Sequence, residues 1–446
     1  MPNQSAQRDA RGVPVSSCQP ESLEDYEKAI YQFQSYFGDP TETLAATLEN
    51  DPEFVMGHIF TASAMLPMSE RQYLPMVNES LDKAEALTHK SNDREKALIK
   101  AARLWSAGDW YGACAVWDRV LSDYPHDAMA LQCAHLTDFL LGDAMNLRDR
   151  VGRVLPHWSP DDTGYSYVLG MHAFGLEECN QYAEAEDAAL KALSIEARDG
   201  WSVHAATHVM EMQNRFQDGQ KFLRSSSDNW APDNGFAFHN WWHLGLFHVE
   251  ENDFEGALKL YDEQVFVEDA DVSMQMLDAS ALLWRLHLQG VELGERWQAM
   301  SALWQRKTEV ENGYYAFNDM HAVMCMVGAD QYAEAESVVA ELKKAAETNP
   351  PLTAMMARDV GVPACQAIIA HGKGNHDEVI DLLFPIRSYA NRFGGSHAQR
   401  DVLSQTLLDS ALQAKQWGVA SNLLNERSEM KADSPLTKRY KDRLQH

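Results

Sequence analysis

The hydrophobic positions of this chain recur with helical spacing from Glu21 onward, and alternating stretches rich in Val, Ile and Thr are missing. Short turns of Gly, Asn or Asp interrupt the pattern, and after each turn a bulky residue is followed by a small one. This periodicity predicts helical hairpins and almost no strand. The bulky residues are Trp110, Tyr182, Phe216, Phe254, Tyr332, His376 and Trp417.

The hairpins form a repeat. Most of the turns follow one another after 34 to 44 residues, and the two longer gaps contain weaker versions of the turn around Met145 and Gly294. Ala113, Trp117 and Pro125 match the small, aromatic and closing positions of a tetratricopeptide repeat (TPR). We therefore expect an all-α, TPR-like helical-hairpin solenoid (an α/α superhelix). It should have about ten or eleven hairpins, be tightly curved, and carry the first helix of each hairpin on its inner face.

The same pattern predicts the domain organisation. Residues 1–20 are polar, with Gly12 and Pro14 breaking local order, and should form an N-terminal arm along the first repeat. Residues 21–446 should form one solenoid domain, because each hairpin can bury its apolar face only against its neighbours.

The chain is strongly acidic, with 66 Asp and Glu against 38 Lys and Arg and a net charge of -28. A charge of this sign repels phosphate backbones and anionic lipid surfaces, so we expect neither nucleic acid nor a membrane as a partner. The chain also has no apolar run of membrane-spanning length and no apolar run after its N-terminal basic residues.

The cysteines stand singly, without the close pairs of a zinc site or the density of a disulfide scaffold. We interpret them as reduced thiols, which together with the missing signal sequence predicts a cytoplasmic protein. They are Cys18, Cys114, Cys133, Cys179, Cys325 and Cys365.

Two histidine pairs in the middle of the chain are the main candidates for chemistry. His204 and His208, like His239 and His243, are four residues apart, so each pair lies on one face of its helix, and Glu211 extends the first face by one turn. Counted from the aromatic residue of the turn, the face with His204, His208 and Glu211 takes the positions that line the concave groove in TPR domains, as that resemblance implies. His239 also faces inward by this count, whereas His243 is either inner or intermediate. We expect the imidazoles of His204, His208 and His239 to meet around one cavity.

A zinc-like divalent metal ion would fit this cluster, with His204, His208 and His239 as ligands and an open position for water. The H-E-x-x-H spacing of metalloproteases is missing. The metal-free alternative uses His204 or His208 as a general acid or base, with Glu211 or Asp319 orienting the ring. A third interpretation is that the imidazoles are satisfied packing residues.

A candidate anion site lies further along the chain. Arg358-Asp359 and Arg400-Asp401 occupy nearly equivalent places in consecutive repeats, so their guanidinium groups should stack and bind a carboxylate or phosphate. The alternative is that each arginine pairs with its own aspartate between repeats. His321, in a first helix between the histidines and the arginines, would connect the two groups if the superhelix closes on itself.

Six stretches carry a family resemblance: DPEFVMGH (51–58), WSVHAATHVMEM (201–212), FHNWWH (238–243), FNDMH (317–321), ARDVGVP (357–363) and GGSHAQRDV (394–402). With these stretches the chain resembles the tetratricopeptide repeat protein 38 family over nearly its full length. The resemblance implies an α-helical TPR-like solenoid and brings no settled activity.

Two functions of different classes remain open. In the first, a central His/Asp/Arg/Trp pocket, with Trp242 as a wall and His239 and His243 contacting the ligand, binds and transforms a small polar or anionic metabolite. In the second, the chain is an interaction scaffold that binds a peptide or a partner's tail in the TPR groove. The concentration of His, Trp, Asp and Arg in the middle of the chain favours the pocket and an enzyme of undefined reaction class. A homodimer is compatible with both.

Overall fold

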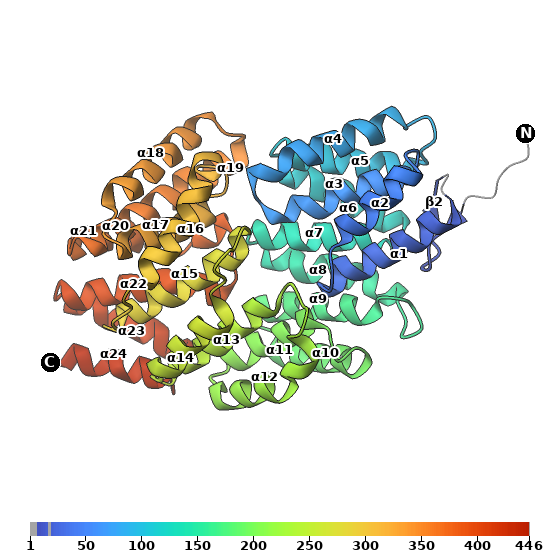
Figure 1. Cartoon of the computed structure of the whole chain (residues 1–446). Helices are drawn as coiled ribbons and strands as arrows, with labels where there is room; N and C mark the ends of the chain where they lie inside the picture. Colours follow the sequence, from blue (N-terminus) through green and yellow to red (C-terminus); the bar gives the residue numbers. More distant parts are fainter. Residues whose placement is uncertain (1–6, 17–18, 446) are drawn as a thin grey trace, which may run out of the picture. The chain divides into compact units, whose positions relative to one another are not determined.

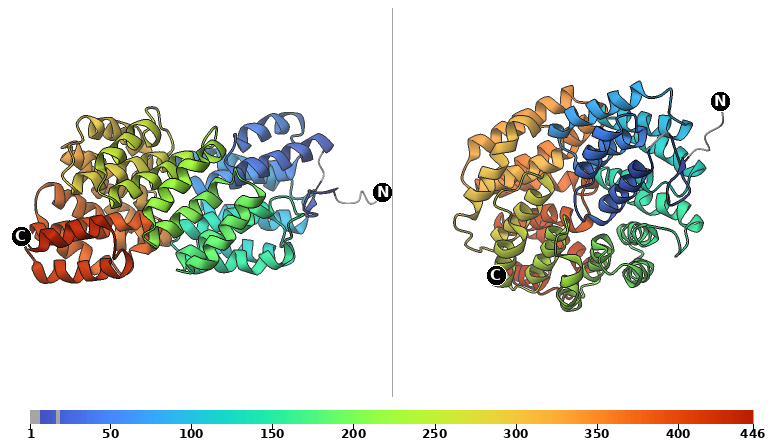
Figure 2. Two further views of the ribbon diagram at one scale, coloured as in Figure 1. Left: turned by 90° about the horizontal axis from the view of Figure 1, so that it is seen from below. Right: turned by 45° about the vertical axis from the view of Figure 1, so that its right-hand side comes forward.

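The computed structural model describes residues 7–16 and 19–445, and within these residues it is all-α apart from one two-stranded sheet. Successive helices lie side by side as hairpins (Figure 1, Figure 2). The chain divides into two compact units. The first unit comprises Met1–Ala206 and Asn229–Phe236, and the second comprises Thr207–Asp228 and Ala237–His446.

The first unit begins with a short β-hairpin and continues as helices. Its elements are β1 (Gln7–Arg8), β2 (Pro14–Val15), α1 (Pro20–Ser35), α2 (Pro40–Asn50), α3 (Val55–Met65), the 3-10 turns η1 (Leu66–Met68) and η2 (Arg71–Tyr73), α4 (Leu74–Ala86), α5 (Asp93–Ser106), α6 (Trp110–Asp123), α7 (Ala128–Leu140), α8 (Ala144–Val154), the 3-10 turn η3 (Leu155–His157), α9 (Tyr165–Glu178), α10 (Tyr182–Ile195) and the start of α11 (Gly200–Met212).

The second unit takes the end of α11 and most of α12, and continues to the C-terminus. Its elements are α12 (Phe216–Trp230), α13 (Ala237–Glu250), α14 (Phe254–Leu260), the π-turn η4 (Tyr261–Val265), α15 (Ser273–Leu288), α16 (Arg296–Glu311), α17 (Ala316–Gly328), α18 (Tyr332–Thr348), α19 (Pro351–Met356), the π-turn η5 (Ala357–Gly361), α20 (Val362–Gly372), α21 (His376–Ile386), the 3-10 turn η6 (Ala390–Phe393), α22 (His397–Gln413), α23 (Trp417–Met430) and α24 (Pro435–Gln445).

The hairpin turns have a common chemistry. The first helix of a hairpin ends at a residue of positive φ, a conformation that Gly, Asn and Asp tolerate best. The aspartate that follows often caps the second helix: Asp109 accepts a hydrogen bond from the Gly112 N–H, and Asp253 accepts one from the Gly256 N–H. These turns are the ones that the sequence pattern predicted. The positive-φ residues are Gly108, Gly142, Asn180, Asn214, Asn252, Gly290, Asp330, Gly374 and Lys415.

First and second helices differ in burial. In α13 every residue from Leu244 to Glu250 is buried, whereas α10 buries only Ala185, Ala189 and Ala192. First helices therefore form the inner layer of each unit, and second helices form the outer layer.

Both units wind tightly. In the first unit α1 packs against α7, and in the second unit α15 packs against α22 and α13 against α24. Side chains of these helices therefore fill the inner face of the second unit. This is the face on which a TPR array would form a groove for a peptide. The predicted all-α, tightly curved TPR-like solenoid of about ten or eleven hairpins is confirmed.

The described part of the predicted arm contacts two helices of the first unit. The Ala10 N–H donates to Glu27 of α1, and Arg94 of α5 donates to the Pro14 carbonyl. Residues 1–6 of the predicted arm, and residues 17–18 with Cys18, lie outside the described residues. That residues 21–446 form a single domain stays a prediction.

Two other expectations can be compared with the described residues. Five of the six cysteines are free thiols there, and four of these five are buried. Among the helices described, none combines the length and the apolar character needed to cross a bilayer.

Candidate functional site

The candidate site of the second unit is built on α11 and α13. Both helices are almost wholly buried, so their polar side chains face protein rather than solvent. α11 contributes His208 and Glu211, and α13 contributes His239, Trp242 and His243. Residues four positions apart lie on the same face of a helix, so the polar side chains of each helix point to one region of the unit.

Three imidazoles meet in this region. The ring centres of His208 and His243 are 4.5 Å apart, those of His239 and His243 are 4.9 Å apart, and one ring nitrogen from each of the three lies within 4.8 Å of the others. None of the three side chains is more than 3% exposed. Imidazoles bound to one tetrahedral zinc ion at about 2.0–2.1 Å have ring centres about 5 Å apart, which is close to the observed spacings.

Two buried carboxylates orient two of the rings. His239 Nδ1 lies 2.6 Å from Asp278 Oδ2, and His243 Nδ1 lies 3.1 Å from Glu211 Oε2. Because a carboxylate accepts, each Nδ1 donates, and each ring then presents the lone pair of its Nε2 as the acceptor or ligand atom. Carboxylates that orient histidines in this way are typical of metal sites.

Trp242 lies against this cluster, and its role as the wall of a ligand pocket stays a prediction. Its ring stacks on His239 at 5.2 Å and 19° and meets His243 edge-on at 4.8 Å. The guanidinium of Arg285, on α15, lies 5.5 Å from the centre of the indole. The indole is fully buried, so it shields the imidazoles from solvent.

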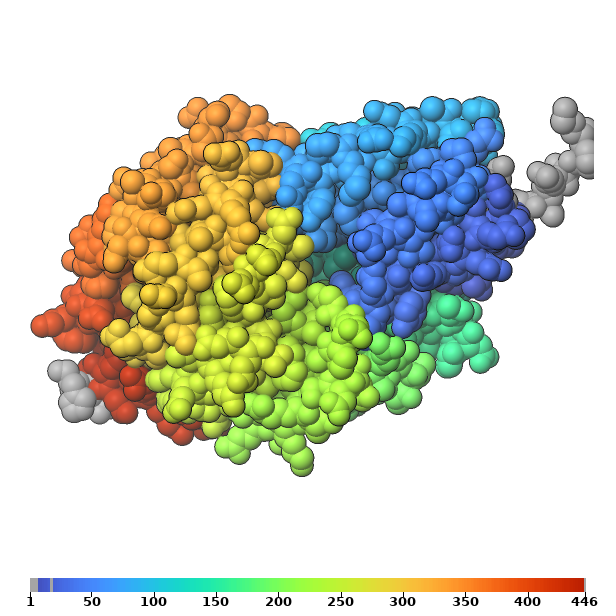
Figure 3. Space-filling model, in the orientation of Figure 1, coloured from blue at the N-terminus to red at the C-terminus, as the bar shows by residue number. Residues whose placement is uncertain are grey.

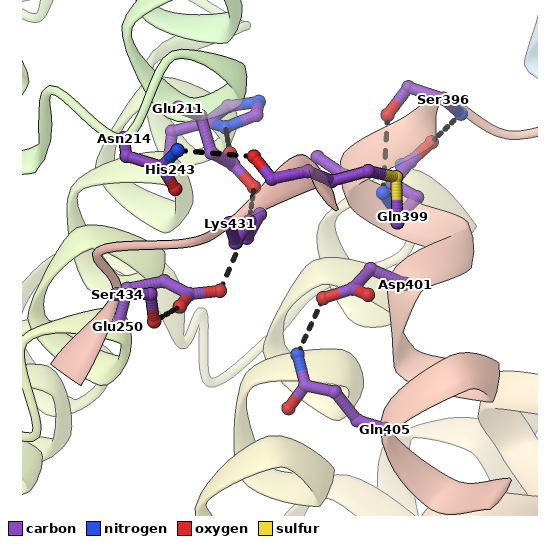
Figure 4. A network of polar contacts seen from close by, with 12 residues as sticks. Glu211, Asn214, His243, Glu250, Ser396, Gln399, Asp401, Gln405, Lys431 and Ser434 are labelled. Atoms are coloured by element: carbon purple, nitrogen blue, oxygen red, sulfur yellow. Dashed lines mark hydrogen bonds and ion pairs between the residues drawn. The ribbon is translucent and has the colours of Figure 1, made fainter. Parts of the chain in front are cut away.

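An ionic network continues from the histidines to the C-terminal segment (Figure 4). Glu211 accepts from His243 with one oxygen and from Lys431 Nζ with the other, at 3.1 Å. Lys431 also binds Glu250 at 2.9 Å, and the hydroxyl of Ser434 donates to the same carboxylate. The turn between α23 and α24 is thereby fixed to the inner helices.

Arg427 completes the network by binding Glu250 at 2.7 Å and Asp401 at 3.1 Å. Burial by itself would raise the pKa of Glu250, but the cations Lys431 and Arg427 outweigh it and hold that pKa below its usual value. The same opposition applies to Lys431: burial acts to lower its pKa, and Glu250 and Glu211 raise it above the usual value. Glu250 and Lys431 therefore stay charged at neutral pH.

The charged groups of this region do not balance when the partly exposed Asp401 is included. Three buried carboxylates (Glu211, Glu250, Asp278) and one that is 15% exposed (Asp401) lie with three buried cations (Arg285, Arg427, Lys431), which leaves an excess of one negative charge (4 − 3 = 1). Burial raises the pKa of Asp278, and His239 opposes that shift. A further positive charge next to these groups, from a proton or a metal ion, would neutralise the excess negative charge.

A small cavity lies within the network. It has a volume of about 10 Å³ and is lined by Glu211, Glu250, Arg285, Asp401 and Gln405 among others. That volume suits about one water molecule, whereas drug-sized ligands occupy pockets of about 300 to 1,000 Å³. In this conformation the cavity is suited to water and not to a metabolite.

His204 belongs to the first unit, one turn before His208 on α11. Its ring packs among Phe174 at 5.0 Å, Trp201 at 5.1 Å and Phe236 at 5.3 Å. Its predicted meeting with His208 and His239 stays a prediction.

The structure places Asp319 and His321 on α17. Asp319 accepts from the backbone N–H of Gly313 at 3.2 Å, which supports the turn before the helix. His321 Nδ1 donates to the Phe317 carbonyl at 2.8 Å, and burial lowers the pKa of this imidazole to about 4. The contacts described for these two residues are thus local to α17.

The two Arg-Asp pairs differ from each other. Arg358 binds Asp359 at 2.8 Å with 60% of its side chain exposed, whereas Arg400 donates to the carbonyl of Gly395. Asp401 binds the guanidinium of Arg427. Pairing of an arginine with its own aspartate is therefore seen for Arg358, and a shared anion site stays a prediction.

Sequence reasoning missed several members of the network. Asp278 and Arg285 are isolated charges in the apolar helix α15 and lie seven residues apart on one face, a signal that could have identified them. Lys431 gave no such signal, because the polar linker between α23 and α24 has the composition of an exposed loop.

No family model matches the chain. The human IFIT1 dimer with m7Gppp-AAAA is similar over 96% of this chain and 95% of that chain, with 10% identity and a TM-score of 0.42. The APC/C hetero-tetramer Cut9–Hcn1 is similar over 91% and 75%, with 11% identity and a TM-score of 0.42. Yeast Tom70 is similar over 78% and 88%, with 12% identity and a TM-score of 0.35.

At these scores the likeness supports no inference about function. Membership of the tetratricopeptide repeat protein 38 family stays a prediction from the sequence motifs. The same holds for the enzyme activity, the homodimer, the cytoplasmic location and the exclusion of nucleic acid.

Proposed function

We propose that the second unit binds a divalent, zinc-like metal ion through the imidazoles of His208, His239 and His243. The observation that carries the proposal is the convergence of three buried ring nitrogens, two of them on rings whose Nδ1 faces a buried carboxylate. Three imidazoles supply a nitrogen shell that suits zinc and leave a fourth position for water or another ligand.

The electrostatics of the site support a cation. The four carboxylates of the region, one of them the partly exposed Asp401, outnumber its three basic groups and so attract positive charge. Asp278 and Glu211 would act as orienting partners that raise the basicity of the ligands. The proposed function is metal binding; transformation of a metabolite at this site would require it to open, because the adjoining cavity holds about one water molecule.

Elemental analysis of the purified chain, with a zinc titration against a chromophoric chelator, tests the proposal. We expect about one equivalent of metal per chain, and a loss of at least a hundredfold in affinity for His243→Ala. His89→Ala is the matched control, because His89 is an exposed histidine of the first unit. A wild-type chain that neither contains nor binds zinc would contradict the proposal.

Asp278→Asn provides a second variant that keeps the three imidazoles. Since partners of metal-bound histidines typically contribute about 10- to 100-fold in metal affinity, we expect the zinc affinity of this variant to fall by about that factor. Circular dichroism should show an unchanged helix content. An unchanged zinc affinity in a folded Asp278→Asn protein would mean that the carboxylate does not orient a ligand.

A further inference from the structure

A groove runs along the outer face of the first unit between α2 and α4, with α3 as its floor. It has a volume of about 680 Å³. Ala45 and Leu48 line it from one face of α2, Met76 lines it from α4, and Leu87 lines it directly after the end of α4. The blue segments that contain these helices lie at the surface in the space-filling view (Figure 3). Two helices thus direct apolar side chains into one open channel.

These apolar faces are incompletely covered by the chain itself. α2 buries only Leu44 and Thr47, which leaves Ala45 exposed and Leu48 half-buried. Met76 is 38% exposed. A flexible methionine beside small aliphatic side chains is typical of surfaces that accommodate an apolar helix.

The rim of the groove is acidic. Glu42 and Glu49 lie along α2 and Glu79 lies on α4, and all three are exposed. Lys83, the one lysine that lines the groove, binds Glu79 at 2.8 Å. On the floor, His58 contacts the Pro52 carbonyl through Nε2, and burial lowers the pKa of this imidazole, so it adds no charge at neutral pH. The lining therefore carries three carboxylates against one ammonium group.

We propose that this groove binds an amphipathic α-helix of a partner protein whose apolar face is flanked by lysine or arginine. The 11 residues of α2 span about 16 Å, so the occupant contacts the groove over about three helical turns. Its apolar side chains lie between Leu48 and Met76, and its basic side chains reach Glu42 and Glu49. An acidic helix of the same apolar pattern would be repelled by these carboxylates.

The test uses two synthetic 14-residue helical peptides with the same leucine face, one flanked by lysines and one by glutamates. Their binding to the full chain is measured by fluorescence anisotropy at low and high salt. We expect the lysine peptide to bind, more weakly at high salt, and the glutamate peptide to bind at least tenfold more weakly. Glu42→Lys with Glu49→Lys should reverse this preference, and Leu48→Glu should abolish binding of the lysine peptide.

The matched control is Glu184→Lys with Asp161→Lys, which changes the same charge of the same unit at exposed positions outside the groove. Equal affinity for both peptides, or equal effects of the groove and control variants, would overturn the proposal. So would a concentration-dependent dimer that Leu48→Glu dissociates in analytical ultracentrifugation, because the occupant would then be a second copy of the chain.

Discussion

At the scale of single residues, the second unit is defined by buried ions that depend on one another. Lys431 is the clearest case, because one ammonium group serves both Glu211 and Glu250, and all three side chains are at most 7% exposed. Removing one partner of such a group leaves uncompensated buried charge, which is more costly than the net contribution of the intact pair.

Lys431→Met should therefore lower the free energy of unfolding of the second unit by about 3 to 5 kcal/mol. Chemical denaturation followed by circular dichroism measures this change. Lys438→Met, at an exposed position on α24, is the control and should stay within about 0.5 kcal/mol of the wild type. Equal effects of the two variants would show that the network contributes little.

His135, in the first unit, makes stability depend on pH. Burial, aided by Arg150, lowers the pKa of this imidazole to about 3. A histidine whose folded pKa is depressed contributes stability above its unfolded value of about 6.5, and that stability is lost as the pH falls from about 6.5 towards 3, at about 1.4 kcal/mol per pH unit.

We expect His135→Leu to make the loss of stability between pH 6.5 and 4.5 shallower by about 1.4 kcal/mol per pH unit. Urea denaturation at a series of pH values checks this slope. His89→Leu, at an exposed position, should leave the slope unchanged. A His135→Leu slope equal to that of the wild type would mean that other groups control acid unfolding.

At the scale of the elements, the hairpin turn is the unit that the sequence specifies best. Gly108, Asn180 and Asn252 occupy the left-handed position that ends a first helix. Lys415 occupies the equivalent position between α22 and α23 with φ 56°, although its side chain does not favour that conformation.

Lys415→Gly should therefore stabilise the chain by about 0.5 to 1 kcal/mol, since relief of strain exceeds the entropy that glycine loses on folding. Thermal unfolding monitored at 222 nm checks the sign. Lys438→Gly, inside α24, should destabilise by about 1 kcal/mol, because it introduces glycine into a helix. The prediction is wrong if both glycines destabilise.

The sequence predicted the hairpins and the inner helices because turn residues and helical periodicity are local signals. It also singled out His239, His243 and Glu211 as candidates, because their spacing lies within single helices. It missed the pairing of His239 with Asp278 and of Glu211 with Lys431, which join residues 39 and 220 positions apart in the chain. Such pairings depend on how tightly the unit curves, and periodicity does not contain that information.

At the scale of the whole molecule, closure of the second unit depends on its last helix. α24 packs against α13 and buries Leu436 and Tyr440 completely, and the Tyr440 hydroxyl accepts from Gln289 at 2.7 Å. A truncation after Asp433 removes these contacts together with Ser434.

We expect this truncation to lower the melting temperature of the second unit and to increase hydrogen exchange in α13, whereas exchange in α5 of the first unit stays at its wild-type rate. Hydrogen exchange with mass spectrometry separates the two units. Unchanged protection of α13 would show that α24 only covers the surface.

The link between the histidines and the C-terminal segment also imposes an order during synthesis on the ribosome. Lys431 is made 188 residues after His243, since 431 − 243 = 188. At about 5 to 20 residues per second, that interval lasts about 10 to 40 seconds. During this interval the chain already contains the three histidines, but the segment with Lys431, which later covers Glu211, has not yet been synthesised. Under the proposed function, a nascent chain can therefore bind the metal ion before it completes the fold that encloses the site.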